Sequence, residues 1–237
     1  TCGRAPMAIT GAASTCSRLL TRVSSAWAWI MWTSSINRMD SETPLDETMG
    51  ALASAVEQGK ALYVGLSRYD EPALRRATEI LDARHVPYVI NQYRYNILER
   101  GIVDDGSLAA SAELRCGIIT FSPLAQGLLT SRYLDRVPAD SRMAHDPRYL
   151  KRSALTPEVH ARLVALDRIA RDRGQKLAQM ALSWQLHDPR VTGVLIGASR
   201  PGQILENFKA LDEEGWSPEE LASIDEAALG KAFEAEK

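Results

Sequence analysis

The sequence predicts a parallel α/β fold, and three observations lead to this prediction. From residue 43 onward, short apolar runs alternate with amphipathic segments, which is the pattern of strands followed by helices. Each apolar run stops at small or polar residues, as in the endings GLS, NQ, SPL and IGAS. The chain has no G-x-G-x-x-G turn, in which a doubly wound open sheet would gather its phosphate-binding glycines. A parallel barrel, whose ligand site is built from the carboxyl ends of its strands, is therefore favoured over an open sheet.

The first predicted helix covers residues 43–60. Thr43 can cap its beginning and Pro44 fits the first turn, where a missing N–H costs nothing. Asp46 and the glutamate after it complement the positive end of the helix dipole. Gly59 can end the helix because glycine adopts the left-handed conformation that closes a last turn.

The remaining elements continue the alternation. Strands are predicted at residues 61–67, 88–92, 117–122 and 191–198. Helices are predicted at residues 71–84, 105–115, 157–187, 201–211 and 218–229. A closed (β/α)8 barrel has eight strands and typically about 250 residues. The four clear strands therefore correspond to about half of such a barrel.

Composition excludes several classes of function. The chain has 237 residues, of which 45% are hydrophobic and 24% charged, and its net charge is −2, as expected of one globular domain or two small ones. Nucleic acid is an unfavourable partner because the basic residues are scattered and show no excess. No apolar run approaches transmembrane length. The chain has three cysteines, Cys2, Cys16 and Cys116, which is an odd number, and their spacing is not that of metal ligands. We therefore expect no disulfide framework and no metal site, and we expect the protein to lie in a reducing cytoplasm.

Six segments resemble the aldo-keto reductases, most closely the branch that includes bacterial L-glyceraldehyde 3-phosphate reductase and the potassium-channel β subunits. The resemblance implies a (β/α)8 TIM-barrel fold, of which this chain would be a C-terminal partial barrel of about four to five βα units, at residues 38–237. The six segments follow the order of the family: GKALYVGLSRYD (59–70), NQYRYNILER (91–100), FSPLAQGLLTSRYL (121–134), DSRM (140–143), RGQKLAQMALSWQL (173–186) and VLIGASRPGQILENFKAL (194–211).

The resemblance implies that Ser67 and Gln92 hold the carboxamide of a nicotinamide cofactor. The carboxamide has one acceptor and two donors, which suit a hydroxyl and an amide. Without a cofactor, the same residues would be a serine at a strand end and a surface amide. We expect them to bind the nicotinamide.

A second implied contact is the loop that follows the strand at 117–122. In the family, this loop wraps the pyrophosphate, where backbone N–H groups and a closely approaching glycine are useful. A plain strand-to-loop turn would also use proline and glycine. The implied pyrophosphate residues are Ser122, Pro123, Leu124, Gln126 and Gly127.

A third implied contact is the segment IGASRPGQILEN, which leads into a helix. Phosphate binds well at the beginning of a helix, and an arginine there supplies a fixed positive charge for a 2′-phosphate. NADP(H) is therefore preferred over NAD(H), for which a carboxylate would be the ribose partner. A capped amphipathic helix with exposed polar residues is the alternative. The implied residues are Gly197, Ser199, Arg200, Gln203, Glu206 and Asn207.

No catalytic residue can be placed in this sequence. The family uses an Asp, a Tyr, a Lys and a His, which lie on strands before the matching segments; the Tyr is the general acid. For the intact gene, the resemblance implies NADPH-dependent reduction of an aldehyde or ketone to an alcohol, with L-glyceraldehyde 3-phosphate as a candidate substrate. We expect the chain as written to be inactive. The alternative is a non-catalytic NADP-binding or interaction protein, like the channel β subunits. A homo-oligomer is possible, and no membrane partner is expected.

Residues 27–37, WAWIMWTSSIN, carry three of the five tryptophans and match no family segment. Residues 26–37, written in permitted codons and read two bases later, become MGLDYVDIFYQ, which is the family strand that precedes this point. Residues 13–25 likewise become KYLLASLDQSLKR, the family helix before that strand. Our hypothesis is that residues from about 5 to 37 are an out-of-frame translation, so that 1–37 is an aberrant segment.

In this hypothesis the family frame resumes at Arg38, and the catalytic His is lost at the junction. The alternative is a real hydrophobic strand or a patch that binds a partner. In either case an apolar, β-compatible run can occupy a strand site, so we expect residues 27–36 to lie along the exposed edge of the sheet.

Overall fold

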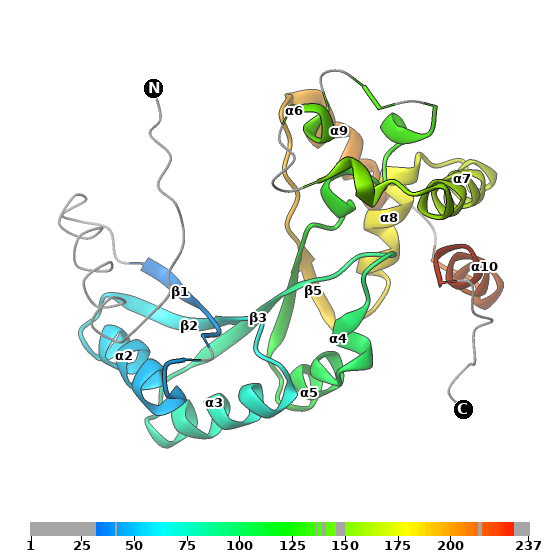
Figure 1. Cartoon of the computed structure of the whole chain (residues 1–237). Coiled ribbons are helices and arrows are strands. Elements are labelled where there is room, and N and C mark those ends of the chain that lie inside the picture. Colours follow the sequence, from blue (N-terminus) through cyan, green and yellow to red (C-terminus); the bar gives the residue numbers. More distant parts are fainter. Residues whose placement is uncertain are drawn as a thin grey trace. The chain divides into compact units, whose positions relative to one another are not determined.

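In the computed structural model, the chain folds into two compact units (Figure 1). Unit 1 consists of residues 1–93 and 102–118, and unit 2 consists of residues 94–101 and 119–237. The structure describes residues 32–40, 42–135, 137–138, 141–145, 150–212 and 215–229. One sheet has the strand order β1-β2-β3-β4-β5, and the boundary between the units passes through β3 and β4.

Parallel strands form the centre of unit 1. Strand β2 (Ala61–Ser67) pairs in parallel with β1 (Trp32–Arg38) on one side and with β3 (Tyr88–Arg94) on the other. The predicted strand at 61–67 is confirmed, and the one predicted at 88–92 continues to Arg94. Since β1 is the edge strand, the prediction for residues 27–36 is confirmed from residue 32 onward, and residues 27–31 lie outside the described residues.

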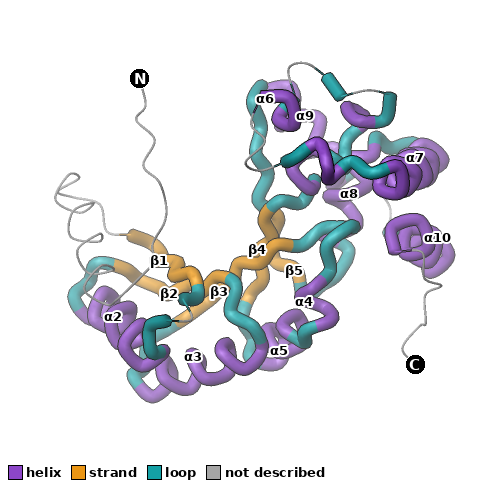
Figure 2. The backbone as a smooth tube through the Cα atoms, in the orientation of Figure 1, coloured by secondary structure: helices purple, strands orange, loops and turns teal. Residues whose placement is uncertain are grey.

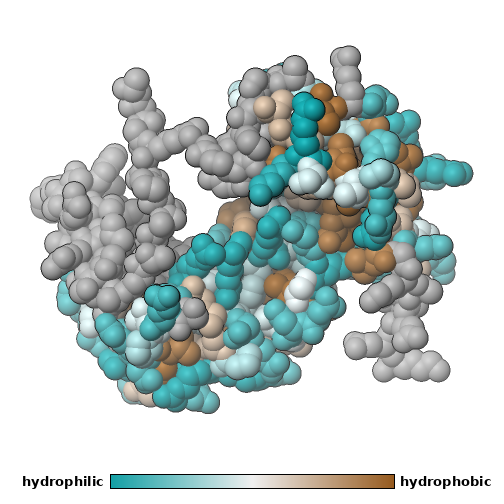
Figure 3. Space-filling view, in the orientation of Figure 1, coloured by the Kyte–Doolittle hydropathy of each residue, from teal (hydrophilic) through white to brown (hydrophobic). Residues whose placement is uncertain are grey.

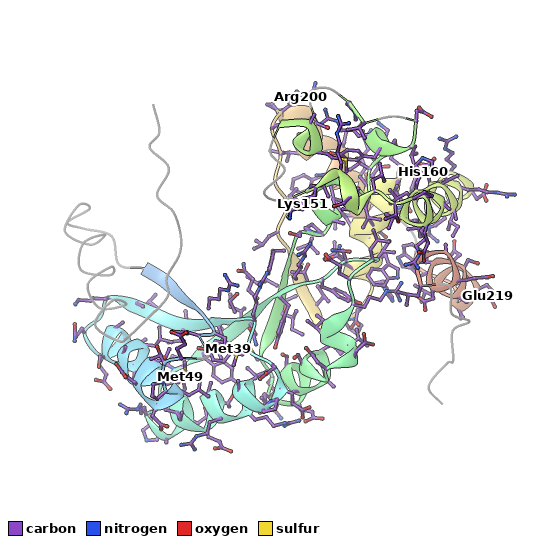
Figure 4. All side chains as sticks on the ribbon, viewed as in Figure 1. Met39, Met49, Lys151, His160, Arg200 and Glu219 are labelled. Carbon is purple, nitrogen blue, oxygen red and sulfur yellow. The ribbon has the colours of Figure 1, made fainter. Side chains whose placement is uncertain are left out.

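Helices α2 (Leu45–Glu57), α3 (Glu71–Ala83) and α5 (Ser107–Glu113) lie along one side of these strands (Figure 2). The short helix α4 (Gly101–Asp104) precedes α5. The buried core between helices and strands includes Leu52, Leu66, Leu74 and Leu81. Met49, on α2, is a fully buried member of this core, and the partly buried Met39 packs against the same core (Figure 4). Burial of each such side chain contributes roughly 1.5–3 kcal/mol, so this core holds the helices against the strands.

The beginning of α2 differs from the sequence prediction. The Thr43 hydroxyl donates a hydrogen bond to the Asp40 carboxylate, at 2.8 Å, and does not cap the helix. Pro44 takes the N-cap position, and no side chain caps the helix. The prediction that Thr43 caps this helix was therefore wrong, because the Thr43 hydroxyl binds the nearby Asp40 carboxylate and not the N–H groups of the helix. Gly59, with a φ of 66°, ends the helix as predicted.

Unit 2 contains the end of β4 and a set of helices. Strand β4 (Gly117–Phe121) ends one residue earlier than predicted, and β5 (Val191–Val194) ends before the predicted 198. The N–H of Leu195 still donates to the Thr120 carbonyl at 2.7 Å, so the carboxyl ends of β4 and β5 adjoin. The helices of unit 2 are α6 (Arg142–His145), α7 (Pro157–Asp172), α8 (Leu177–Leu186), α9 (Pro201–Phe208) and α10 (Pro218–Leu229).

The single helix predicted at 157–187 is wrong, because α7 and α8 are separate. Gly174 has a φ of 75°, which is left-handed, and the N–H of Gln175 donates back to the Ala170 carbonyl at 2.8 Å. This arrangement closes the last turn of α7. The chain then reverses into α8, whose side chains Leu177, Met180 and Trp184 are buried.

Helix α10 is held by charged side chains as well as by apolar contacts. The Arg100 guanidinium forms an ion pair with the Asp225 carboxylate, and both side chains are nearly buried. The same guanidinium lies 4.5 Å from the centroid of the Trp184 ring, within cation–π range. Arg162 donates to the Ala228 carbonyl at 2.9 Å. These contacts fix α10 onto the rest of unit 2.

We predict that Gly174→Ala lowers the free energy of unfolding by about 1–2 kcal/mol, because a Cβ is disfavoured in the left-handed conformation. An added Cβ meets no atom within 4 Å there, so the cost is conformational only. Gly101→Ala is the matched control, since Gly101 also has open space and no positive φ, and it should leave stability unchanged or raise it by up to about 1 kcal/mol. Urea unfolding measures both. Equal effects of the two substitutions would contradict the left-handed turn.

Candidate cofactor site

Ser67 and Gln92 lie directly opposite each other on the paired strands of unit 1. The Ser67 hydroxyl donates to the Gln92 carbonyl at 3.3 Å, and the N–H of Arg68 donates to the same oxygen at 3.0 Å. Ser67 is the last residue of β2, and its neighbour Arg68 has a left-handed φ of 60°. The structure thus brings together the two residues predicted to hold the nicotinamide, at the carboxyl ends of adjacent strands.

A buried polar network stabilises this end of the sheet. Asn91 donates to the Tyr93 hydroxyl oxygen at 2.6 Å, and that hydroxyl donates to the Tyr69 carbonyl at 2.6 Å. Burial raises the pKa of Tyr93 to about 12, and burial also raises the pKa of Tyr95 to about 12. Both phenols therefore stay protonated at neutral pH. Tyr93 acts as a hydrogen-bonding group, and the ring of Tyr95 packs against that of Trp184. The network fixes the backbone on either side of Gln92.

The loop after β4 adopts an unusual backbone conformation in unit 2. Ser122, Ala125 and Gln126 have φ of 55°, 47° and 60°, and Gly127 has a φ of 103°. The Gln126 amide donates to the Ser122 hydroxyl at 2.8 Å. The N–H groups of Ala125 and Gly127 donate within the loop, to the carbonyls of Ser122 and Leu124. The loop is thus a tight structure, and left-handed residues of this kind occur where a backbone approaches a ligand.

Two buried amides that the sequence analysis missed hold this loop in place. Asn96 donates to the Ser122 carbonyl at 3.1 Å, and Gln185 donates to the Pro123 carbonyl at 3.1 Å. The Gln185 oxygen also accepts from the Thr120 hydroxyl at 2.8 Å. Both amides are fully buried. Gln185 is one of three polar residues of α8, with Gln179 and Ser183, so the sequence alone did not single it out.

The beginning of α9 is capped by the side chain of Gln203, which belongs to the first turn of the same helix. The Gln203 side-chain oxygen accepts from the N–H of Ser199 at 2.8 Å, from the Ser199 hydroxyl at 3.1 Å and from the N–H of Arg200 at 3.3 Å. These two N–H groups are ones that a phosphate at the helix would otherwise use. The exposed side chain of Arg200 (Figure 4) is then the group that offers positive charge to an anion. Gly197 is exposed, with open space around its Cα.

Glu206 lies on the part of α9 that contacts the start of α8. The Lys176 ammonium forms an ion pair with the Glu206 carboxylate, and Gln179 donates to the Glu206 carbonyl at 3.0 Å. The hydrogen bond from Lys176 lowers the pKa of Glu206. Asn207 is half-buried. These contacts attach α9 to the start of α8, and the predicted contact of Glu206 and Asn207 with adenosine stays a prediction.

Within unit 2, the loop at 122–127 and the start of α9 follow adjacent strand ends, because the Leu195–Thr120 hydrogen bond joins β4 and β5. Ser67 and Gln92 form a separate pair in unit 1. Among the described residues, no group of three His, Cys, Asp or Glu side chains is arranged to hold a metal ion. None of the described helices is both long and apolar enough to cross a membrane.

A family model described as the aldo/keto reductase family matches residues 34–229. The chain belongs to the aldo/keto reductase family, a family of oxidoreductases. A thermostable aldo-keto reductase solved with the inhibitor epalrestat has a TM-score of 0.69 and 24% identity, and the match covers 91% of this chain and 67% of that one. The predicted α/β fold of the (β/α)8 barrel family is thereby confirmed, and the five described strands represent part of such a barrel.

Two relatives are similar over most of this chain. L-glyceraldehyde 3-phosphate reductase of Escherichia coli strain K12 is 45% identical over 195 residues, which are 80% of this chain and 56% of the reductase. A probable voltage-gated potassium channel subunit beta of Oryza sativa subsp. japonica is 34% identical over 179 residues, which are 74% of this chain and 55% of that protein. The chain therefore spans about half the length of the curated relatives it matches.

We predict that a double-mutant cycle at Thr120 and Gln185 shows strong coupling. Gln185→Leu alone leaves the buried Thr120 hydroxyl and the Pro123 carbonyl without a partner, and should cost about 1–3 kcal/mol for each lost partner. In the Thr120→Val background, Gln185→Leu should lower the free energy of unfolding by less, because the Thr120 hydroxyl is no longer there to be left without a partner. Urea unfolding of all four proteins measures the coupling. Additive costs would show that the Thr120–Gln185 hydrogen bond is absent.

Proposed function

We propose that this chain forms the NADP(H)-binding part of an aldo-keto reductase that reduces a small aldehyde or ketone to an alcohol. The observation that carries the proposal is the pairing of Ser67 with Gln92 at the carboxyl ends of β2 and β3. A hydroxyl and an amide side by side can satisfy the acceptor and both donors of a carboxamide. Ser67 and Gln92 would hold the carboxamide of a bound nicotinamide.

For unit 2, taken by itself, we propose that two groups bind the phosphates and the adenosine of the dinucleotide. The loop formed by Ser122, Pro123, Leu124, Gln126 and Gly127 lies against the pyrophosphate. The start of α9, with Gly197, Ser199, Arg200 and Gln203, receives the adenosine phosphate, and Glu206 and Asn207 face the adenine side. Arg200 is the partner of the 2′-phosphate, because its exposed guanidinium presents a permanent charge in a planar fork.

Bound NADPH would supply the hydride, and the residues of this chain position it. Reduction also needs an acid that protonates the carbonyl oxygen. Tyr93 and Tyr95 do not serve, since both are buried and burial raises their pKa to about 12. We propose that residues 1–237 as written contain none of the four family catalytic groups, the acid included.

The similarity to the E. coli reductase supports L-glyceraldehyde 3-phosphate as the substrate of the intact enzyme. Cys116, which the structure shows as a free and buried thiol, agrees with a cytoplasmic protein. Substrate loops vary within one fold, so a panel of small aldehydes and ketones, with and without phosphate, is the appropriate assay.

We also propose that residues from about 5 to 37 are an out-of-frame translation, with the reductase portion at 38–237. In support, the family match begins at residue 34, and synonymous codons for residues 13–37 can be chosen so that another reading frame gives a family helix and strand. Strand β1 then occupies an edge position in the described sheet. Sequencing the gene across this region tests the proposal; a verified, uninterrupted frame with no family coding in the other frame would contradict it.

A second candidate is a non-catalytic NADP-binding or interaction protein. It is favoured by the 34% identity to the probable channel subunit beta. Titration with dinucleotide, in the presence and absence of a carbonyl substrate, separates the two candidates. Binding that never leads to oxidation of NADPH, even when a complete barrel is restored, supports the second.

We predict that Arg200→Ala weakens NADPH binding about 10- to 100-fold and weakens NADH binding less than about threefold. A hydrogen bond to a charged group contributes about 1.5–3 kcal/mol, and only NADPH carries the 2′-phosphate. Arg168→Ala is the matched control, because Arg168 is another exposed arginine of unit 2, on α7. Fluorescence titration of each dinucleotide gives the affinities. An equal loss of affinity for NADPH and NADH would show that Arg200 does not bind the 2′-phosphate.

We predict further that this chain reduces carbonyls at a rate at least 10²–10⁴-fold below that of a complete family enzyme. The loss of a general acid alone accounts for about this factor. The measurement is NADPH oxidation with a small aldehyde, beside the E. coli reductase as the positive control. Comparable turnover from both proteins would show that the catalytic groups lie within residues 38–237.

A further inference from the structure

The Tyr93 hydroxyl lies at the centre of a buried set of hydrogen bonds on β3. It accepts from the Asn91 amide at 2.6 Å and donates to the Tyr69 carbonyl at 2.6 Å. The Asn91 amide also donates to the Tyr69 carbonyl, at 3.4 Å. Asn91 and Tyr69 are fully buried, and Tyr93 is 3% exposed. Because polar groups buried to this degree need partners, these hydrogen bonds hold the backbone at Tyr69 against β3.

These hydrogen bonds lie on the opposite face of β3 from the Gln92 side chain. Successive side chains of a strand alternate between its two faces, so Asn91 and Tyr93 share a face that Gln92 does not. Asn91 is paired in register with Leu66, which belongs to the core formed with residues of α2 and α3. The surface that α3 presents in Figure 3 is mostly hydrophilic. The Asn91 and Tyr93 side chains are instead polar groups inside the core, on the face of the sheet that the helices cover.

The backbone between Ser67 and Tyr69 is strained at Arg68. Arg68 has a φ of 60°, in the left-handed region that residues with a Cβ avoid. Strain of this kind persists only where the surrounding structure fixes it. Two contacts with β3 do so here: the N–H of Arg68 donates to the Gln92 carbonyl at 3.0 Å, and the Tyr93 hydroxyl holds the Tyr69 carbonyl. The turn that follows Ser67 is thus attached to β3 at two successive residues.

The Ser67 hydroxyl itself is held weakly. It donates to the Gln92 carbonyl at 3.3 Å, which is longer than the range of about 2.5–3.0 Å usual for a hydroxyl donor and an oxygen acceptor. The hydroxyl can therefore turn to a carboxamide without the loss of a strong hydrogen bond. Its direction depends on the backbone of Ser67, which the turn at Arg68 determines.

We propose that Tyr93 is a positioning residue for the nicotinamide: its hydroxyl fixes the strained turn at Arg68 and thereby directs the Ser67 hydroxyl at the carboxamide. Tyr93 acts from the face of the sheet that the helices cover, so it does not touch the cofactor. The proposal rests on the proposed function, in which Ser67 binds the carboxamide. It implies that loss of the Tyr93 hydroxyl weakens binding of the nicotinamide and leaves binding of the adenosine phosphates unchanged.

A double-mutant cycle of Tyr93→Phe and Ser67→Ala in this chain tests the proposal, with isothermal titration calorimetry of NADPH. Each single substitution should weaken NADPH binding about 3- to 10-fold, the range for one neutral hydrogen bond. Because Tyr93 acts through Ser67, the double variant should bind NADPH no more than about twofold more weakly than Ser67→Ala alone. Adenosine 2′,5′-bisphosphate has no nicotinamide, so its affinity for the four proteins should agree within about twofold.

Tyr88→Phe is the matched control, because it removes a hydroxyl from the other end of β3 that accepts from the Thr78 hydroxyl at 3.0 Å. In urea unfolding it should lower stability about as much as Tyr93→Phe does, yet it should change NADPH affinity less than about twofold.

Three results would overturn the positioning role while the NADP(H) proposal stands: additive losses of NADPH affinity, no loss for Tyr93→Phe, or an equal loss for adenosine 2′,5′-bisphosphate. Unchanged NADPH affinity in Ser67→Ala would contradict the nicotinamide contact itself, and the role of Tyr93 with it.

Discussion

Parallel pairing of β2 with β3 is the constraint on which the rest of the site depends. Because both strands run in the same direction, their carboxyl ends meet at one edge, and the register places Ser67 opposite Gln92. A slip of one residue would turn every side chain of a strand to the other face. The buried hydrogen bonds of Asn91 and Tyr93 to the backbone at Tyr69 oppose such a slip, since it would leave them unsatisfied in the core.

Much of the fold could be predicted from the sequence because buried parallel strands form continuous apolar runs. The run at 61–67 is such an apolar run, and its bounds in the structure are the predicted ones, although Leu62 and Tyr63 within it are exposed. Predictions of helix beginnings and ends from single residues failed where another nearby residue determined the structure. The hydroxyl of Thr43 binds Asp40 rather than the helix, and a left-handed glycine at 174 breaks a segment whose amphipathic pattern continues through it.

The candidate site was harder to predict from the sequence than the fold was, for two physical reasons. Ser67, Gln92 and Arg200 were identified through resemblance, because a serine or arginine at the end of an element has no periodic pattern of its own. Asn96 and Gln185 were missed because they bind the backbone carbonyls of Ser122 and Pro123, partners that only the folded chain brings near. The capping of α9 by Gln203 is a short-range contact, yet it could be recognised only once the helix start was known.

Hydrogen exchange of backbone amides, with and without NADP⁺, tests most directly the claim that the strand carboxyl ends hold the dinucleotide. The account predicts slower exchange at residues 65–68 and 90–93 in unit 1 and at 122–128 and 197–204 in unit 2. Exchange in the middle of α3 should be unchanged, because its residues lie away from those strand ends. Saturating NADP⁺ that leaves all four segments unchanged, or that protects α3 instead, would contradict it.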